Sequence, residues 1–493
     1  MVNPQIRSKY RTTIGIECHV QLKTATKLFA AVGNDAREAD PNTLVSPICF
    51  GMPGTLPVLN KEAVHLAMRA AFALNTEPQR FSIFERKHYF YPDLPMGYQI
   101  TQLQQPIIVG GFVEPEVDGK PFRVQINRVQ IEADAGKSTH PAGKDYSLVD
   151  LNRAGTPLLE IVSEADMHSA AEAKAYTHEL YLRMRFADVS DCNLYYGNMR
   201  FDVNVSVSTT DELGTRTETK NINSFRAVEK TVEYEVNRQI ELLEKGEKIA
   251  QETRGWDDAK QRTFKQRTKE DAEDYRYMPD PDLPPIELEL AQIEAVRAEM
   301  PILPDEWRIR LQSLGLDKAA MELLLEAELD DVGAYYLALI EEVIAEKEFA
   351  KQLANWFVNL EVPLRHDGAS TLNAALTSQG RLALYRATAE LIAADKLSSS
   401  NAKALITKVL TNTEQISDIA AYAKQHNLIQ ESDAGALDAI AKQIIEENPK
   451  AAEDVKNGEM KAIGFLVGQV MKHSQGRANP QIAQALIKQQ LGL

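Results

Sequence analysis

The segment Gly15–Leu22, GIECHVQL, decides the fold of the first part of this chain. Apolar and polar residues alternate here with a period of two, so a β-strand would place them on opposite faces. Glu17 and His19 then share the polar face. We expect the apolar face to pack against a core. The polar face is a site for chemistry if neighbouring strands add acids to it, and an ordinary solvated surface if they do not.

Other segments repeat this pattern and supply such acids. RFDVNVSV, residues 200–207, alternates cleanly, and in FRVQINRVQIEADAG the apolar phase slips between Ile126 and Val129, which predicts a β-bulge. YSLVDLNRAGTPLLEIVS follows with further polar side chains. The carboxylate, amide, hydroxyl and guanidinium groups collected in this way belong to Glu132, Asp134, Arg153, Glu160, Arg200, Asp202, Asn204 and Ser206.

These residue types indicate a magnesium and nucleotide cradle. Hard divalent cations prefer carboxylate oxygens, and phosphoryl transfer needs such cations together with cationic side chains. Histidine is an uncommon magnesium ligand, so His19 is left with three interpretations: it contacts phosphate, it orients Glu17, or it is a structural histidine. A solvated sheet face remains the alternative for the whole set.

Composition bounds the class of protein. With 493 residues, 44% of them hydrophobic and 26% charged, the chain predicts a soluble globular protein of about three domains. No apolar run approaches the ~20 residues that span a bilayer, and the N-terminus lacks the apolar core of a signal peptide. Three cysteines far apart predict reduced thiols. We therefore expect a cytoplasmic protein.

Charge is distributed unevenly along the chain. The net charge of −16 argues against indiscriminate coating of nucleic acid, which depends on Lys and Arg neutralising phosphates. Residues 460–493, however, contain four Lys or Arg residues and no acidic one. This end of the chain is either an RNA-contacting segment or a mildly basic helix end.

The chain changes character near YMPDPDLPP, residues 277–285. Seventeen of the 22 prolines precede residue 300, as do the alternating segments, and almost continuous helical patterns follow. We expect an α+β domain over residues 1–293, an all-α domain over 294–410 and a helical tail over 411–493. Within the first domain, helices are predicted from Asn60 to Leu74, after a capping box at Ser169 and Glu172, and from Phe225 to Gly246.

Two further motifs are ambiguous or misleading. DAGKST resembles the end of a phosphate-binding loop, but Ile131 stands where the first glycine belongs, so a turn is expected. The segment FERKHYFYPDLPMGYQITQ, residues 84–102, is stiffened by prolines. Its aromatic residues, Tyr89 and Tyr91 among them, either stack on an adenine or RNA base or pack within their own domain. The sequence contains no H-E-x-x-H, C-x-x-C or G-x-S-x-G motif of a zinc or serine hydrolase.

Nine segments in order carry a resemblance to one family. They are GIECHVQLKTATKLF, GMPGTLPVLN, HYFYPDLPMGYQITQ, DAGKSTH, VDLNRAGTPLLEIV, MRFDVNVSV, KNINSFRAVEK, QETRGWD and YRYMPDPDLPP. Together they closely resemble the B subunit of the glutamine-dependent aspartyl/glutamyl-tRNA amidotransferases. The C-terminal GFLVGQVMK and GRANP resemble that subunit's helical tail, so the likeness covers nearly the whole chain.

The resemblance implies a fold and an activity. It implies a cradle like that of glutamine synthetase, built on an antiparallel sheet and followed by helical and tail domains that bind tRNA. It implies a ligase that uses ATP and Mg²⁺ to phosphorylate the side-chain carboxylate of Glu or Asp on a misacylated tRNA, tRNA(Gln) or tRNA(Asn). Ammonia from the glutaminase A subunit then displaces the phosphate, and a small C subunit completes a heterotrimer.

The resemblance also implies roles for particular residues. Glu17, His19, Glu132 and Glu160 would be catalytic and hold magnesium beside the γ-phosphate. Many relatives read E-E-D-A-G-K where this chain has Ala133, so Glu132 or Asp134 would replace the second acid. The residues expected to bind ATP or its phosphates are Lys137, Arg153, Arg200, Asp202, Asn204 and Ser206. Those expected to bind tRNA are Tyr89, Tyr91, Lys472 and Arg477.

Two other functions also account for part of the sequence. An ATP-dependent ligase of a free small acid would explain the cradle but not the helical extension with its acid-free end. A non-catalytic tRNA-binding scaffold would explain the tail but not the converging acids.

Overall fold

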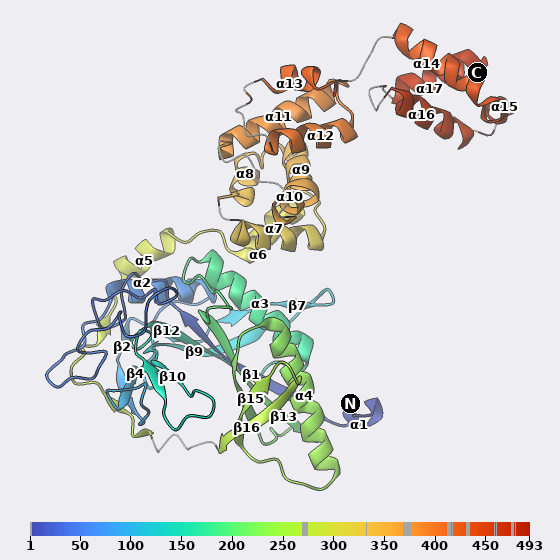
Figure 1. Ribbon diagram of the computed structural model, residues 1–493. Helices are drawn as coiled ribbons and strands as arrows, with labels where there is room; N and C mark the ends of the chain where they lie inside the picture. Colours follow the sequence, from blue (N-terminus) through green and yellow to red (C-terminus); the bar gives the residue numbers. More distant parts are fainter. Residues whose placement is uncertain are drawn as a thin grey trace. The chain divides into compact units, whose positions relative to one another are not determined.

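The chain forms two compact units, Met1–Pro304 and Asp305–Leu493. The computed structural model describes residues 2–268, 275–331, 333–367, 376–411, 416, 418–429, 434–457, 459, 461–474, 478 and 480–493. Figure 1 shows the strands gathered in the first unit and helices alone in the second. The α+β class predicted from the sequence is confirmed.

A nine-stranded sheet is the centre of the first unit. Its strands, in spatial order, are β16 (Arg262–Thr268), β15 (Glu252–Asp257), β14 (Thr217–Ile222), β13 (Met199–Ser208), β1 (Arg11–Gln21), β12 (Pro157–Ser163), β9 (Val124–Ala133) and β5 (Ile108–Val109), and β6 (Phe112–Val113) also pairs with β9. Neighbours are antiparallel except β14 and β15. That parallel pair departs from the expected antiparallel sheet because helix α4 (Phe225–Glu244) makes the crossover between the two strands.

Shorter strands form small sheets around the main one. β3 (Glu85–His88) lies between β4 (Tyr98–Thr101) and β17 (Met278–Pro279). The remaining pairs are β2 (Phe81–Ser82) with β18 (Ile286–Glu287), β7 (Glu116–Val117) with β8 (Lys120–Pro121), and β10 (Lys137–Thr139) with β11 (Leu148–Asp150). The DAGKST segment therefore leads into strand β10 rather than forming the expected turn, because Lys137–Thr139 pair with β11.

The alternation in β1 sorts its side chains as predicted. Ile14, Ile16, Cys18 and Val20 are buried in the main core, and the residues between them are partly exposed. The register of β9 against β12 shifts between Val162 and Ser163, opposite residues 126–128, so the expected bulge is confirmed. All three cysteines are free and buried.

Helices cover the apolar side of this sheet, α3 and α4 packing against each other and α4 against β13. The helices of this unit are α1 (Pro4–Arg7), α2 (Lys61–Ala73), α3 (Ala170–Phe186), α4 and α5 (Leu290–Ala298). Asn60 caps α2 and Ser169 caps α3, as predicted. In a capping box the Glu172 carboxylate would accept a hydrogen bond from the backbone N–H of Ser169. Here it accepts one from the backbone N–H of the preceding residue, His168. Gly246, with φ +76°, follows the end of α4.

The second unit is helical throughout its described part. Its helices are α6 (Pro304–Ser313), α7 (Lys318–Asp330), α8 (Tyr336–Glu342), α9 (Lys347–Trp356), the π-helix η2 (Phe357–Glu361), α10 (Val362–His366), α11 (Ser378–Ala393), α12 (Ser399–Leu410), α13 (Ile419–Gln425), α14 (Ala434–Glu447), α15 (Pro449–Lys456), α16 (Lys461–His473) and α17 (Pro480–Leu491). The last four share a core of their own. None of the described helices is long and apolar enough to cross a membrane.

Candidate active site

Strand pairing brings the polar face of β1 beside acids from three other strands. In the antiparallel register His19 lies opposite Glu160 of β12, and Glu17 lies opposite Asp202 of β13. Glu132 of β9 lies one strand further, opposite Leu158. Residues far apart in the sequence therefore meet on one rigid surface, which suits positioned chemistry.

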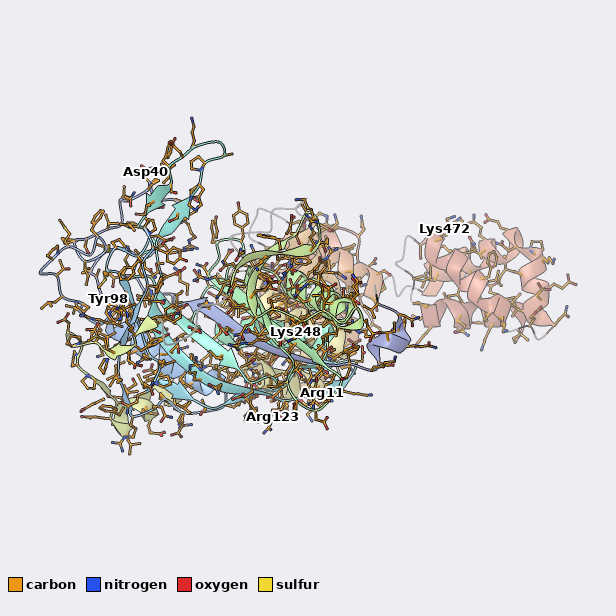
Figure 2. The ribbon with its side chains drawn as sticks, turned by 90° about the horizontal axis from the view of Figure 1, so that it is seen from below. Arg11, Asp40, Tyr98, Arg123, Lys248 and Lys472 are labelled. Carbon is orange, nitrogen blue, oxygen red and sulfur yellow. The ribbon has the colours of Figure 1, made fainter. Side chains whose placement is uncertain are left out.

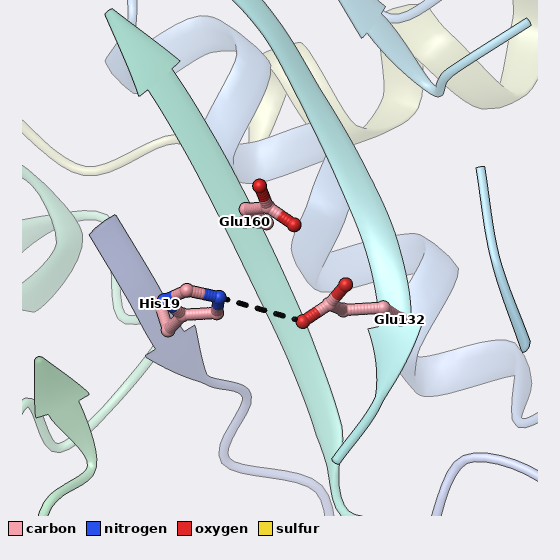
Figure 3. Close-up of side chains that lie close together, drawn as sticks. All are labelled: His19, Glu132 and Glu160. Atoms are coloured by element: carbon pink, nitrogen blue, oxygen red, sulfur yellow. Dashed lines mark ion pairs between the residues drawn. The ribbon is translucent and has the colours of Figure 1, made fainter. Parts of the chain in front are cut away.

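One cluster consists of His19, Glu132 and Glu160, whose potential metal-binding atoms all lie within 4.8 Å of one another. His19 Nε2 lies 3.6 Å from Glu132 Oε1. Figure 3 marks this ion pair with a dashed line. Gln130 Nε2 donates to Glu160 Oε2 at 2.8 Å, which fixes that carboxylate. His19 Nδ1 is buried without a hydrogen-bond partner among the described residues.

A second cluster consists of Glu17, Asp202 and Glu218, whose potential ligand atoms also lie within 4.8 Å of one another. Asn204 Nδ2 donates to Glu17 Oε1 at 3.1 Å. Lys220 Nζ lies 2.7 Å from Asp202 Oδ2 and 3.5 Å from Glu218 Oε1. This cluster thus has an ammonium group of its own chain against two of its three carboxylates.

Burial and mutual repulsion disfavour full ionisation of the acids. Burial raises the pKa of Glu132, an effect that the charge of Lys87 opposes. Burial, and then the charge of the neighbouring acid, raises the pKa of Glu160 and of Glu17. Asp202 differs: burial would raise its pKa, but the Lys220 ammonium together with its other partners, including the hydrogen bond from Asn221 N, lowers it overall. A bound cation would relieve the unfavourable charge of the first three groups.

Asp134 lies outside both clusters and is held by two arginines. Arg200 Nη2 and Nη1 donate to its two carboxylate oxygens at 3.0 and 3.2 Å, and Arg153 Nε lies 3.3 Å away. Although burial would raise its pKa, the charges of Arg200 and Arg153 lower it overall. Arg153 also donates to the carbonyls of Ala135 and Gly136, so it anchors the chain that follows β9.

A cavity of about 320 Å³ adjoins the second cluster. Its lining includes Glu17 of that cluster and side chains able to bind an anion or a polar ligand, namely Arg128, Asn204, Ser206 and Arg216. A cavity of this size accommodates a ligand as large as a nucleotide.

Comparison with known proteins decides the family. Residues 12–294 match the GatB/GatE catalytic domain, and residues 338–491 match the GatB domain. The chain is 42% identical over 490 residues to the B subunit of the aspartyl/glutamyl-tRNA(Asn/Gln) amidotransferase of Carboxydothermus hydrogenoformans, covering 98% of this chain and 99% of that protein. It is 41% identical over 492 residues to the B subunit of the same amidotransferase from Moorella thermoacetica, covering 98% and 100%. The chain belongs to the GatB family. The resemblance drawn from the motifs is confirmed.

The other residues predicted for this GatB-family chain belong to neither cluster. Lys137 is exposed on β10, opposite Asp150. Tyr89 is half-buried, with its ring 5.9 Å from that of Tyr91, which is exposed. Lys472 is exposed in the last turn of α16, where Figure 2 labels it. Arg477 lies outside the described residues.

Three charged residues beside the two acidic clusters were not predicted from the sequence. Glu218 and Lys220 alternate on β14 in the same way as the polar residues of β1, and this period of two in TETKNI was the signal that could have revealed them. Lys87 is half-buried on β3, and its charge acts on Glu132 and Glu160. No local pattern marks Lys87, because its approach to the acids depends on how β3 packs.

Proposed function

We propose that this chain uses ATP to activate the side-chain carboxylate of Glu or Asp carried by a misacylated tRNA, and then amidates it with ammonia. The single observation that carries the proposal is the pair of acidic clusters joined through Glu17 and His19 on β1. Two cation-binding sites on one rigid surface suit phosphoryl transfer, in which charge on the phosphates must be neutralised. The names of the relatives supply the tRNA substrate.

The residues present fit Mg²⁺. Glu17, Asp202 and Glu218 offer only carboxylate oxygens, the ligands that Mg²⁺ prefers, and Glu132 and Glu160 offer two more beside His19. The unpartnered Nδ1 and the raised pKa values of the buried glutamates suit a site that binds a cation. When bound, Mg²⁺ would neutralise charge on the transferring phosphoryl group.

The chain's own residues would bind the nucleotide and orient its phosphates. We assign the nucleotide to the cavity beside Glu17, where Asn204 and Ser206 offer polar contacts to phosphate and Asp202 holds Lys220 in place. Arg153 and Arg200 bind Asp134, so they would orient the phosphates indirectly, by holding this carboxylate in place. Lys137 lies on the exposed strand β10 and would contact a phosphate only from there. Asp134 would then position this end of the site and not bind metal directly.

The chemistry proceeds in two steps. An oxygen of the substrate carboxylate attacks the γ-phosphorus of ATP, the bond to the bridging oxygen breaks, and ADP leaves. Ammonia then attacks the acyl carbon, phosphate departs with the electrons of the C–O bond, and the nitrogen loses one proton, which the departing phosphate can accept. This leaves Gln or Asn on the tRNA. Activation is needed because a free carboxylate would have to expel oxide.

We extend the proposal to partners and domains. Ammonia would come from a glutaminase A subunit, with a small C subunit completing a cytoplasmic heterotrimer. The helical domain over residues 294–410 and the tail over 411–493 would bind tRNA, with Lys472 and Arg477 contacting phosphates and Tyr89 and Tyr91 contacting bases. The separate core of α14–α17 supports a tail that folds as its own module.

The test uses the assembled complex with ATP, Mg²⁺, glutamine and each misacylated tRNA, followed by identification of the attached amino acid. Glu17→Gln should abolish ADP formation that depends on misacylated tRNA while tRNA binding is retained. Glu287→Gln, on the exposed edge strand β18, is the matched control and should behave as wild type. Amidation of free Glu or Asp in place of the tRNA-bound residue would contradict the proposal. Full activity of Glu17→Gln would also contradict the proposal and would favour a chain that binds tRNA without catalysing the reaction.

A further inference from the structure

Two adjacent tyrosines stand exposed just before the catalytic strand β13. Tyr195 exposes 87% of its surface and Tyr196 exposes 47%. Their rings lie 5.1 Å apart at 82°, edge to face. Burying two large aromatic side chains would be favourable. Two adjacent exposed rings therefore indicate a surface that binds a ligand.

The turn that carries the pair is ordered by hydrogen bonds. Tyr196 N donates to Asn193 Oδ1 at 3.1 Å, and Asn198 N donates to Asn193 O at 2.9 Å. Gly197 has φ +72°, a conformation that favours glycine, and lets the chain turn into β13. The tyrosines are therefore presented from a defined turn that holds their backbone in place.

An arginine contacts the pair from a second segment. The Arg37 guanidinium carbon lies 5.8 Å from the Tyr196 ring centroid, within the range of a cation–π contact. Asp35 accepts two hydrogen bonds from the Arg37 guanidinium, both at 2.7 Å, and the Asp191 carboxylate lies 3.7 Å from Arg37 Nη1. Two carboxylates face this one guanidinium and leave a net negative charge, so affinity for a nucleic acid here would come from stacking and not from phosphate contacts.

The pair is close to the acidic clusters along the strand. Arg200 lies opposite His19 in the sheet register, and it stands only four positions after Tyr196 in the chain. At the rise of an extended strand this separation is about 13 Å at most. His19 lies one strand spacing, about 5 Å, beyond Arg200. A single nucleotide with an ester-linked amino acid can extend over this separation toward His19.

We propose that Tyr195 and Tyr196 form a stacking platform for the unpaired bases at the aminoacylated 3′ end of the tRNA. The inference rests on the proposed function and adds where the end of that substrate binds. Every base offers a face to an aromatic ring, so stacking holds single-stranded nucleotides without reading their sequence. Asp191 and Asn193 beside the pair are polar, whereas a protein partner would need a wider apolar patch, so the small aromatic pair favours a stacked base as occupant.

The experiment compares three variants of the assembled complex: Tyr195→Ala with Tyr196→Ala, Tyr195→Phe with Tyr196→Phe, and Tyr146→Ala as a control tyrosine that is 52% exposed elsewhere. Binding of uncharged tRNA is measured with and without its 3′-terminal nucleotide, and KM and kcat are measured for misacylated tRNA. The double alanine variant should bind intact tRNA about tenfold more weakly and raise KM with little change in kcat. The double phenylalanine variant and Tyr146→Ala should resemble wild type.

The decisive comparison is the effect of the terminal nucleotide. Its removal should weaken tRNA binding to the wild type but not to the double alanine variant, because the platform is then already missing. An equal loss in both proteins would overturn the proposal, and so would dissociation of the double alanine complex, which would mark a protein interface. A wild-type complex that binds tRNA through the platform yet fails to amidate it would refute the proposed function and leave this inference standing.

Discussion

Lys220 Nζ lies 2.7 Å from Asp202 Oδ2 across the pairing of β14 with β13, and it also lies 3.5 Å from Glu218. The ammonium therefore compensates two of the three carboxylates in the second cluster. Burial would lower the pKa of Lys220, but Asp202 and Glu218 together raise it, so the side chain stays charged. The ammonium of the chain itself therefore lies beside two of the carboxylates that could also hold a divalent cation.

Lys220→Met tests whether the Lys220 ammonium competes with Mg²⁺ for these carboxylates. Without the ammonium, the three carboxylates should bind Mg²⁺ more readily, so added Mg²⁺ should raise the Tm of the variant more than that of the wild type. ATP-dependent amidation should fall by about 10²-fold or more, as for other lost electrostatic contacts. Lys230→Met, on the exposed side of α4, is the control. Equal Mg²⁺ responses in both proteins would contradict this account.

Asp134→Asn tests whether Asp134 positions the site or binds the metal ion. Because Arg200 and Arg153 bind this carboxylate, its neutralisation should destabilise the fold by about 3 kcal/mol through two uncompensated arginines. The rise in Tm on addition of Mg²⁺ should survive in Asp134→Asn and be reduced in Glu132→Gln. Thermal unfolding with and without Mg²⁺ measures both effects. Equal loss of the Mg²⁺ response would make Asp134 a ligand after all.

Glu235 should make stability depend on pH. This buried carboxylate on α4 accepts from Arg238 Nη2 at 2.7 Å and from Thr217 Oγ1 at 2.8 Å, and Arg254 Nε lies 3.1 Å away. Burial would raise its pKa, but the bonds from Arg238 and the other partners lower it below the ordinary 4.5. A lowered pKa contributes stability above about pH 4.5, and that contribution is lost as pH falls through the folded-state value.

Glu235→Gln tests this linkage. At pH 7 the variant should be about 3 kcal/mol less stable than wild type in urea unfolding, because Arg238 and the buried Arg254 each lose a carboxylate partner. The difference should shrink as the pH falls from about 4.5 toward the lower folded-state pKa, because the unfolded chain takes up the proton first. Glu241→Gln, exposed on the same helix, should show no such trend. A difference independent of pH would show that Glu235 acts through packing alone.

Replacing glycine by alanine should lower the stability at one position and raise it at another. A Cβ at Gly136 would lie 2.8 Å from Asp150 O and 2.9 Å from Leu151, so Gly136→Ala should destabilise the first unit by about 1–3 kcal/mol. Gly464, inside α16, has nothing within 4 Å of an added Cβ, so Gly464→Ala should stabilise by up to about 1 kcal/mol. Differential scanning calorimetry measures both. An unchanged Tm of Gly136→Ala would contradict this, because it would mean that the chain around β10 and β11 shifts to accommodate the Cβ without loss of stability.

Much of the local structure was predictable because its causes are local. The period of two in β1 and β13, the bulge in β9 and the caps at Asn60 and Ser169 all follow from neighbouring residues. The DAGKST segment was less predictable, because its strand exists only through pairing with the separate segment Leu148–Asp150. The parallel pairing of β14 with β15 likewise depends on a crossover that no local pattern specifies.

By itself the sequence determined which side chains each strand offers to its polar face, since alternation is a property of the extended backbone. It also determined the family, since many segments match in order over nearly the whole chain. Only the tertiary structure decided which polar residues meet: Glu218 and Lys220 join Glu17 and Asp202, whereas Asp134 is bound by Arg153 and Arg200. The physical reason is that sheet order and register bring distant segments together, and these depend on packing of the whole unit.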